Sequence, residues 1–306
     1  MDISTGTVEC LQQANAILGE GPVWDARTGE LFWVDIRRGQ VFRFHLATGE
    51  QTGQWAFAER VGCVALTDDP GILVVASGLV VHLLELATGE TEVLSDLSDG
   101  RSRKRFNDGE VDARGRLWIG TMLDDYFDPK GFSGGELLRI DPDGSVEPFG
   151  EYQLPNGIGW SLDQATMYIN DSAAGITYAL DFDAEAGRAC NRRPIFTPSA
   201  YLGVPDGMSV DAEGNIWCAM WDGWALIRLA PDGTVKERIE MPVRRPSSAT
   251  FCGEGLDRLA ITSATVNFTS ADYAKSPKAG GLFFMSAGCR GRNPNLFALR
   301  EQGAAA

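Results

Sequence analysis

The stretches DGEVDARGRLWIGT (residues 108–121) and DGMSVDAEGNIWCAM (206–220) share one pattern. In both, small and polar residues lead into an Asp-rich turn, and a strand-like run of about five residues follows the turn. The same unit recurs at 19–35, 63–77, 156–171 and 248–263. Its apolar runs begin near Leu31, Ile72, Leu117, Met167, Ile216 and Leu259, with spacings of 41, 45, 50, 49 and 43 residues. A repeat of this length holds about four short strands, the content of one propeller blade.

The repeats predict an all-β chain that folds as a single domain, a six-bladed β-propeller. The predicted blades are residues 16–58, 59–100, 101–150, 151–200, 201–243 and 244–300. The segment 7–11 is expected to supply an outer strand to the last blade, which closes the ring without a free edge. Helical and βαβ folds are excluded because the apolar residues do not recur with a period of about 3.6.

The composition argues against several kinds of partner and of catalytic chemistry. The chain has 42 acidic and 27 basic residues, a net charge of −15, which argues against nucleic acid or an anionic membrane as a partner. The start MDISTGTVEC does not resemble a signal peptide, so we expect a cytoplasmic protein. The six cysteines are scattered without a CxxC pair, which indicates neither a zinc knot nor a disulfide framework. Both histidines, His45 and His82, lie in strand-like segments, so a histidine base is not expected.

One column of the repeats is polar. Aligned on the residue before the turn, the repeats carry a polar side chain five positions earlier: Glu20, Asn107, Asn156, Asp206 and Ser247. Because the inner strands of a propeller surround its channel, these side chains are expected to converge at one mouth. Two carboxylates and two carboxamides form an oxygen-only site that suits Ca²⁺ or Mg²⁺. Asp-Gly and Asn-Gly also form turns, but a shared register in four repeats favours a metal site in the channel.

Four motifs carry a family resemblance, in one order along nearly the whole chain: GEGPVW (19–24), RFNDGEVDARGRLWIGTM (105–122), LPNGIGWSLD (154–163) and PDGMSVDAEG (205–214). The chain resembles the senescence-marker-protein/gluconolactonase/regucalcin family. The resemblance implies a six-bladed propeller with one catalytic divalent cation in its channel. It also implies hydrolysis of a sugar (aldono) lactone to the aldonic acid.

The resemblance further implies roles for individual residues. Glu20, Asn156 and Asp206 match the metal ligands, and Asp206 also matches the residue proposed to transfer a proton. Arg105 and Asn107 match substrate-binding positions, and Asp125 stands where some relatives carry a glutamate that contacts substrate. Independently of the resemblance, the aromatic residues Trp24, Trp160, Trp221 and Tyr126 are candidates for the walls of the pocket.

Several alternatives stay open. Oxygen ligands favour Ca²⁺, Mg²⁺ or Mn²⁺, but Zn²⁺ also accepts carboxylates. The same metal site would suit another ester such as an organophosphate, and a non-catalytic calcium-binding propeller is a third possibility. Arg105 and Asn107 favour a sugar lactone, because a hydrophobic organophosphate has little use for a cationic group that binds hydroxyls. We expect a small-molecule substrate, and a monomer or a small homo-oligomer.

Overall fold

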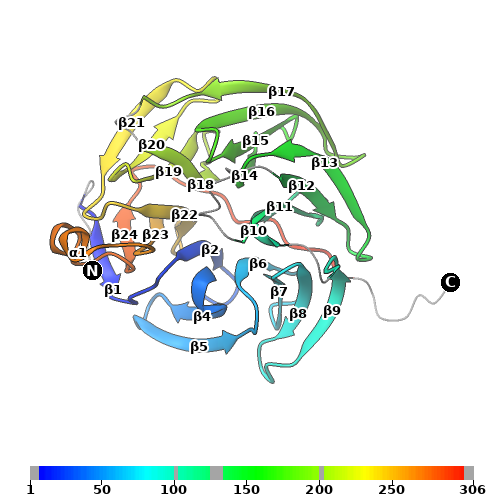
Figure 1. The fold of residues 1–306 in the computed structure, drawn as a ribbon, viewed down its shortest axis with the longest axis horizontal. Coiled ribbons are helices and arrows are strands. Elements are labelled where there is room, and N and C mark those ends of the chain that lie inside the picture. The colour runs from blue at the N-terminus through cyan, green and yellow to red at the C-terminus, as the bar shows by residue number, and fades with distance from the viewer. Residues whose placement is uncertain (1–6, 100–102, 125–133, 200–202, 300–306) are drawn as a thin grey trace.

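The computed structural model describes residues 7–99, 103–124, 134–199 and 203–299. Six four-stranded antiparallel sheets surround a common axis (Figure 1). The innermost strands of neighbouring sheets contact one another in a closed ring. This arrangement confirms the predicted all-β, six-bladed propeller. In this part of the chain, no helix is long and apolar enough to cross a membrane.

The strands follow the chain from the axis outward. Blade 1 contains β2 (Gly19–Asp25), β3 (Glu30–Asp35), β4 (Gln40–His45) and β5 (Glu50–Ala56). Blade 2 contains β6 (Val61–Leu66), β7 (Ile72–Ser77), β8 (Val80–Glu85) and β9 (Thr91–Asp96). Blade 3 contains β10 (Lys104–Val111), β11 (Leu117–Leu123), β12 (Gly135–Ile140) and β13 (Val146–Tyr152).

The remaining blades have the same order. Blade 4 contains β14 (Pro155–Trp160), β15 (Thr166–Asp171), β16 (Ile176–Asp183) and β17 (Arg188–Phe196). Blade 5 contains β18 (Val204–Val210), β19 (Ile216–Trp221), β20 (Ala225–Leu229) and β21 (Val235–Glu240). Blade 6 contains β22 (Pro246–Cys252), β23 (Arg258–Ser263), β24 (Leu282–Ser286) and, outermost, β1 (Glu9–Gln12).

The ring is closed by pairing the two ends of the chain. Strand β1 runs antiparallel to β24, with Glu9 opposite Phe284. The sequence predicted this strand over 7–11, and the ladder instead spans Glu9–Gln12 because pairing with β24 starts at Glu9. The chain after β24 crosses the ring, and Phe297 forms a parallel bridge to Thr67 beside blade 2 (Figure 1). Two short helices lie in the connections, η1 (Ile36–Arg38) and α1 (Ser270–Lys275).

The aspartate that precedes the turn in several of the repeats has a structural role. In blade 3, Asp112 is fully buried and accepts hydrogen bonds from the backbone of Arg114 at 2.8 Å and from Trp118 Nε1 at 2.9 Å. Asp211 does the same in blade 5 with the Trp217 indole at 3.0 Å. Each aspartate therefore closes its turn and anchors a buried tryptophan, which explains why Asp and Trp recur six residues apart in these two repeats.

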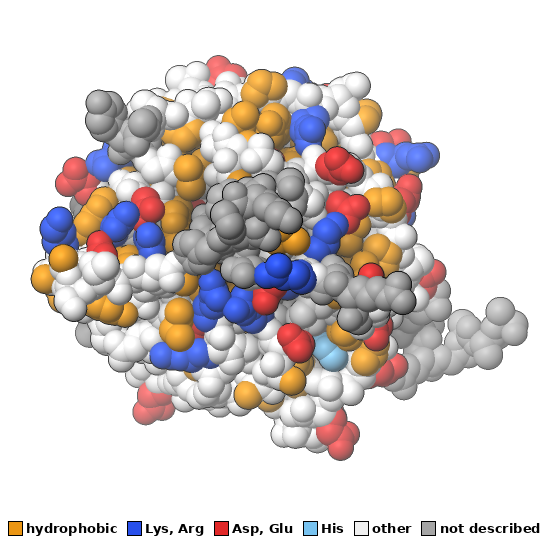
Figure 2. Space-filling model, in the orientation of Figure 1, with side chains coloured by type: hydrophobic (Ala, Val, Ile, Leu, Met, Phe, Trp, Pro, Cys, Tyr) orange, Lys and Arg blue, Asp and Glu red, His pale blue; other side chains and the backbone are white. Residues whose placement is uncertain are grey.

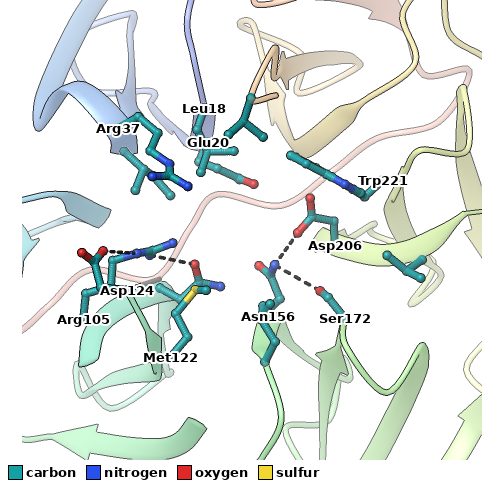
Figure 3. A pocket seen from close by; sticks show the side chains of 15 residues that line it. Leu18, Glu20, Arg37, Arg105, Met122, Asp124, Asn156, Ser172, Asp206 and Trp221 are labelled. Carbon is teal, nitrogen blue, oxygen red and sulfur yellow. Dashed lines mark hydrogen bonds and ion pairs between the residues drawn. The ribbon is translucent and has the colours of Figure 1, made fainter. Parts of the chain in front are cut away.

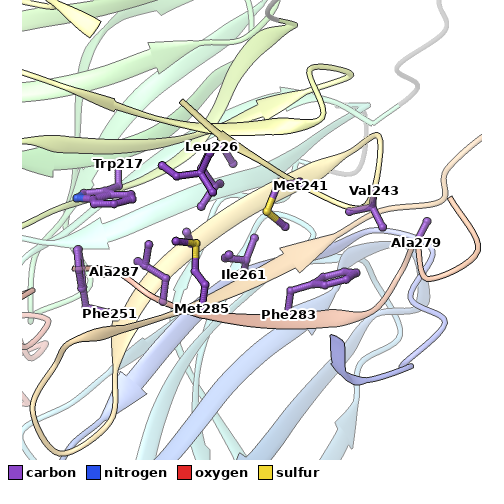
Figure 4. Packing of buried hydrophobic residues seen from close by; sticks show 14 residues of the cluster. Trp217, Leu226, Met241, Val243, Phe251, Ile261, Ala279, Phe283, Met285 and Ala287 are labelled. Atoms are coloured by element: carbon purple, nitrogen blue, oxygen red, sulfur yellow. The ribbon is translucent and has the colours of Figure 1, made fainter. Parts of the chain in front are cut away.

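Apolar side chains from neighbouring sheets pack together between the blades. Between blades 5 and 6, Trp217 and Phe251 meet edge to face, with ring centroids 6.0 Å apart (Figure 4). The outer strands carry fewer buried residues: in β21, VKERIE, only Ile239 is buried. The blades are thus held by apolar packing between sheets, and the inner strand starts can carry polar residues.

Candidate active site at one mouth of the channel

The backbone turns the polar column into the channel. In each of the six inner strands the pairing with the second strand is irregular at this position, for example between Asn156 and Ile158 and between Pro205 and Met208. A β-bulge breaks the in–out alternation and re-aims a side chain. Gly157 permits the close packing: a Cβ there would lie 2.4 Å from the carbonyl oxygen of Asp206.

Five of the predicted site residues line one pocket at this mouth: Glu20, Arg105, Asn107, Asn156 and Asp206. All five are buried. They come from β2, β10, β14 and β18, strands of four different blades. Figure 3 shows Glu20, Asn156 and Asp206 pointing toward the same part of the pocket. The fold therefore brings together oxygen donors that lie up to 186 positions apart, Glu20 and Asp206.

Short hydrogen bonds fix two of these side chains. Asn156 Nδ2 donates to Asp206 Oδ1 and to Ser172 Oγ, the latter at 3.2 Å. The Asn156 oxygen accepts from the backbone of Gly157 at 3.1 Å. Ser172 in turn donates to the carbonyl oxygen of Pro205 at 2.7 Å, which ties blade 4 to blade 5 beside the pocket.

The two carboxylates make the pocket electrostatically unfavourable when ionised. Burial raises the pKa of Glu20 well above its ordinary value, and the charges of Asp206 and Asp108 raise it further. Burial and the charge of Asp108 likewise raise the pKa of Asp206, against the hydrogen bond from Asn156. Asp108 itself has a pKa of about 6, raised by burial and partly offset by backbone hydrogen bonds from Gly109 and Gly157.

These residues fit a divalent cation. Two buried acids that repel each other would be stabilised by a positive charge between them, and carboxylate and amide oxygens are ligands for hard cations. Across the described residues, no cluster of three or more His, Cys, Asp or Glu side chains could hold a metal. A cation at this mouth would therefore depend on two carboxylates and an amide oxygen, with water completing its shell.

The opposite side of the pocket carries arginines. Arg105 Nη1 donates to the carbonyl oxygen of Phe106 at 2.7 Å and to Asn107 Oδ1 at 3.1 Å. Asn107 Nδ2 donates to the carbonyl oxygen of Pro155 at 3.0 Å. The Asn107 amide thus has partners at both ends, which suits a position in the substrate wall. Burial lowers the pKa of Arg105 to about 10.

The structure separates the remaining predicted residues. Ser247, the fifth member of the column, does not line the pocket: its hydroxyl donates to the carbonyl oxygen of Gly19 at 2.5 Å and joins blade 6 to blade 1. Trp24 and Trp160 do not line this pocket, contrary to the prediction, because both pack in the apolar layers between sheets. Trp221 does line the pocket. Asp125 and Tyr126 lie outside the described residues.

The sequence reasoning missed Arg37, Met122, Leu154 and Ser172, which also line the pocket. Arg37 lies in helix η1, whose first turn is capped by Asp35 and ended by Gly39 with φ of 61°. Asp124, which directly precedes Asp125, also lines the pocket and forms ion pairs with Arg60 and, at 3.4 Å, with Arg105. None of these residues belongs to the repeated column, so the repeats gave no signal for them.

Comparisons with known proteins place the chain in a family. The family model described as SMP-30/Gluconolactonase/LRE-like region matches residues 18–265. The chain is 34% identical over 296 residues to 6-deoxy-6-sulfogluconolactonase from Pseudomonas putida, covering 95% of this chain and 99% of the relative. It is 35% identical over 282 residues to L-arabinolactonase from Azospirillum brasilense, covering 91% of each.

A solved structure is similar over the same length. The crystal structure of regucalcin from Agrobacterium tumefaciens, described as a calcium-binding protein, superposes with a TM-score of 0.89 at 28% identity. The superposition covers 95% of this chain and 97% of that one. The repeats, the channel-mouth residues and these matches lead to one conclusion: the chain belongs to the SMP-30/gluconolactonase/LRE-like family.

Proposed function

We propose that the protein hydrolyses a sugar (aldono) lactone to the aldonic acid, with one divalent cation held by Glu20, Asn156 and Asp206. The observation that carries this proposal is the two-sided pocket. Two buried carboxylates and an amide oxygen face one part of it, and Arg105 and Asn107 line the other. The names of the lactonase relatives support a lactone as the substrate.

The chemistry needs little from the protein besides polarisation and proton transfer, because a lactone is already a reactive ester. A bound cation would supply Lewis-acid stabilisation of the negative charge that develops on the carbonyl oxygen. Asp206 Oδ1 accepts from Asn156, which leaves Oδ2 to take a proton from the attacking water. Returning that proton to the ring oxygen as the C–O bond breaks completes the reaction.

The other residues orient the substrate. Arg105 is held by Phe106 and Asn107, so its guanidinium presents donors at a fixed angle to the sugar hydroxyls. Ser172 holds the Asn156 amide in place, because its hydroxyl accepts from Asn156 and donates to the carbonyl oxygen of Pro205. Met122, Leu154 and Trp221 supply an apolar wall that limits the access of water.

The metal is proposed by class only: Ca²⁺, Mg²⁺, Mn²⁺ or Zn²⁺. The description of the regucalcin structure as calcium-binding supports Ca²⁺ and also an alternative, a propeller that binds calcium without hydrolysing lactones. One experiment separates these two functions. Chelated protein is reconstituted with each metal in turn and assayed on a panel of aldonolactones with a pH indicator.

We expect hydrolysis that is abolished by chelation and restored by one or more metals. Glu20→Gln should lose activity, and Glu240→Gln, on the outer strand β21, should not. Calcium binding without turnover of any lactone would favour the non-catalytic alternative. Full activity in metal-free protein would exclude the proposed site.

A further inference from the structure

Trp221 forms the wall of the pocket beside Asp206. It is the last residue of β19 and lies opposite Val204, two residues before Asp206 on the paired strand β18. Trp221 and Val204 both line the pocket, and Trp221 is partly exposed. Figure 3 shows Trp221 on the same side of the pocket as Asp206. A substrate that reaches the proposed base therefore meets an aromatic ring next to it.

The guanidinium of Arg245 holds this ring. Arg245 directly precedes β22, and its Cζ lies 4.8 Å from the centre of the Trp221 ring and 5.1 Å from that of Phe268. Its Nη1 donates to the carbonyl oxygen of Val266, which also lines the pocket. Trp221 belongs to blade 5, whereas Val266 follows β23 of blade 6. One side chain thus joins two parts of the pocket wall that come from different blades.

Arg245 is itself fixed by ion pairs. Its side chain is 12% exposed, and its Nε donates to Asp222 Oδ1 at 2.6 Å. Asp222 also forms an ion pair with Arg244 at 2.8 Å. In the turn after Trp221, Asp222 and Trp224 have φ of 60° and 54°, left-handed values that are rare for a side chain as large as tryptophan. Such a conformation persists only where surrounding contacts hold it, so the turn and the indole before it are kept in one arrangement.

The surroundings of Trp221 suit a small ligand rather than a protein partner. The hydrophobic side chains described on the face in Figure 2 are scattered and form no continuous patch, which a protein interface would need. A sugar lactone has hydroxyls around its rim and C–H groups on the two faces of its ring. The rim can form hydrogen bonds with Arg105 and Asn107, while a C–H face packs on an aromatic ring.

We propose that Trp221 binds a C–H face of the lactone ring and that Arg245 positions the indole for this contact. The inference rests on the proposed lactonase function and narrows its substrate to a lactone with a flat ring face, one that carries no axial hydroxyl there. Arg245 covers one face of the indole, so the substrate lies against the opposite face. An axial hydroxyl would hold the sugar ring away from the indole and lose its own hydrogen bonds to water.

The first test measures binding without hydrolysis. The probes are glucono-δ-lactam, whose ring hydroxyls are all equatorial, and its galacto and allo epimers, which each carry one axial hydroxyl, on opposite faces of the ring. By calorimetry, the wild type should bind the gluco lactam about threefold to tenfold more tightly than at least one epimer, the range for an aromatic contact. Trp221→Leu, which keeps an apolar side chain without a flat face, should lose this difference, and Trp221→Phe should keep most of it.

The second test separates positioning from a structural role. Because Arg245 acts through Trp221 on the ground state and the transition state alike, Arg245→Met should raise KM for glucono-δ-lactone about threefold with kcat nearly unchanged. Arg245→Lys keeps the charge but not the planar fork, so it should restore only part of the affinity. Arg43→Met is the matched control, since Arg43 lies over Trp55 at 5.5 Å in the outer strands of blade 1 and neither residue lines the pocket; it should change neither constant.

Failure of this inference and failure of the lactonase proposal give different results. Unchanged lactam affinities in Trp221→Leu overturn the inference and leave the lactonase proposal intact. An unchanged KM in Arg245→Met, or an equal rise in Arg43→Met, overturns the role of Arg245. If no lactone is hydrolysed with any metal, the proposed function fails and lactam binding decides the inference alone: a preference for the gluco lactam that is lost in Trp221→Leu supports it, and equal or undetectable binding overturns it.

Discussion

Replacing Asp206 with asparagine should make the metal-free protein more stable while it removes activity. Asp206 and Glu20 are buried, and burial together with neighbouring negative charges makes both carboxyl groups harder to ionise. Asparagine keeps the size of Asp206 and an oxygen that can accept from Asn156, but it removes one charge of the pair. Each unit by which folding raises a carboxyl pKa costs about 1.4 kcal/mol at pH values where the group is ionised.

If folding raises the pKa of Asp206 by one unit, Asp206→Asn should raise Tm by about 3 °C. This conversion from free energy to Tm is the one that holds for domains somewhat smaller than this one. Asp211→Asn is the matched control, five residues along the same blade. Burial opposes ionisation of Asp211, but hydrogen bonds from Asn215, Trp217 and Arg228 lower its pKa below the ordinary value. The same substitution there breaks a buried ion pair, at a cost of about 3–5 kcal/mol, so Tm should fall.

The pH dependence gives a second check. Since the pKa of Asp206 is raised in the folded state, the unfolded chain loses this proton first as the pH rises. Stability of the wild type therefore falls from the ordinary aspartate pKa upward, until the folded state is ionised as well. The advantage of Asp206→Asn should be present at pH 7.5 and vanish near pH 4. Below that pH, Asp206 is protonated in both states.

Thermal and chemical unfolding of both variants in chelator, at several pH values, measures these differences. A loss of stability in Asp206→Asn as large as that in Asp211→Asn would refute the reasoning, as would an advantage that does not depend on pH.

The kinetics of Asp206→Asn test whether Asp206 is the general base: kcat at saturating metal and lactone should fall at least about 100-fold. If the variant keeps more than about a third of the wild-type kcat, Asp206 is not the base and serves only as a ligand of the metal.

Three further predictions concern single residues. Glu20→Gln should weaken divalent cation binding at least about tenfold by calorimetry, because it removes one of two anionic ligands; unchanged affinity would place the cation elsewhere. Arg105→Ala should raise KM for polyhydroxylated lactones by about tenfold with a smaller effect on kcat, and an unchanged KM would show that Arg105 does not bind substrate. Gly157→Ala should lower the free energy of unfolding by about 1–3 kcal/mol, because its Cβ would meet the Asp206 carbonyl at 2.4 Å. Gly159→Ala, whose nearest contact is a Val210 methyl group at 3.0 Å, should cost less in the same unfolding experiment.

The sequence by itself determined the architecture and most of the candidate site. The recurring Asp-turn-strand unit located the second strand of every blade to within one residue, for example Ile72 and Ile216. It could do so because turns and buried strands are local features with a fixed spacing. The same register gave Glu20, Asn156 and Asp206, since equivalent positions in a repeat protein occupy equivalent positions around the axis.

Only the tertiary structure decided which polar residues share the pocket and what their charges do there. Ser247 fits the repeated column, yet its hydroxyl donates a hydrogen bond to the Gly19 carbonyl of the neighbouring blade. Arg37 enters the pocket from a turn outside the column. The raised pKa values of Glu20 and Asp206 follow from removing both groups from water and placing them near each other and Asp108. These effects depend on distances between blades far apart in the chain, and a local pattern of residues does not encode such distances.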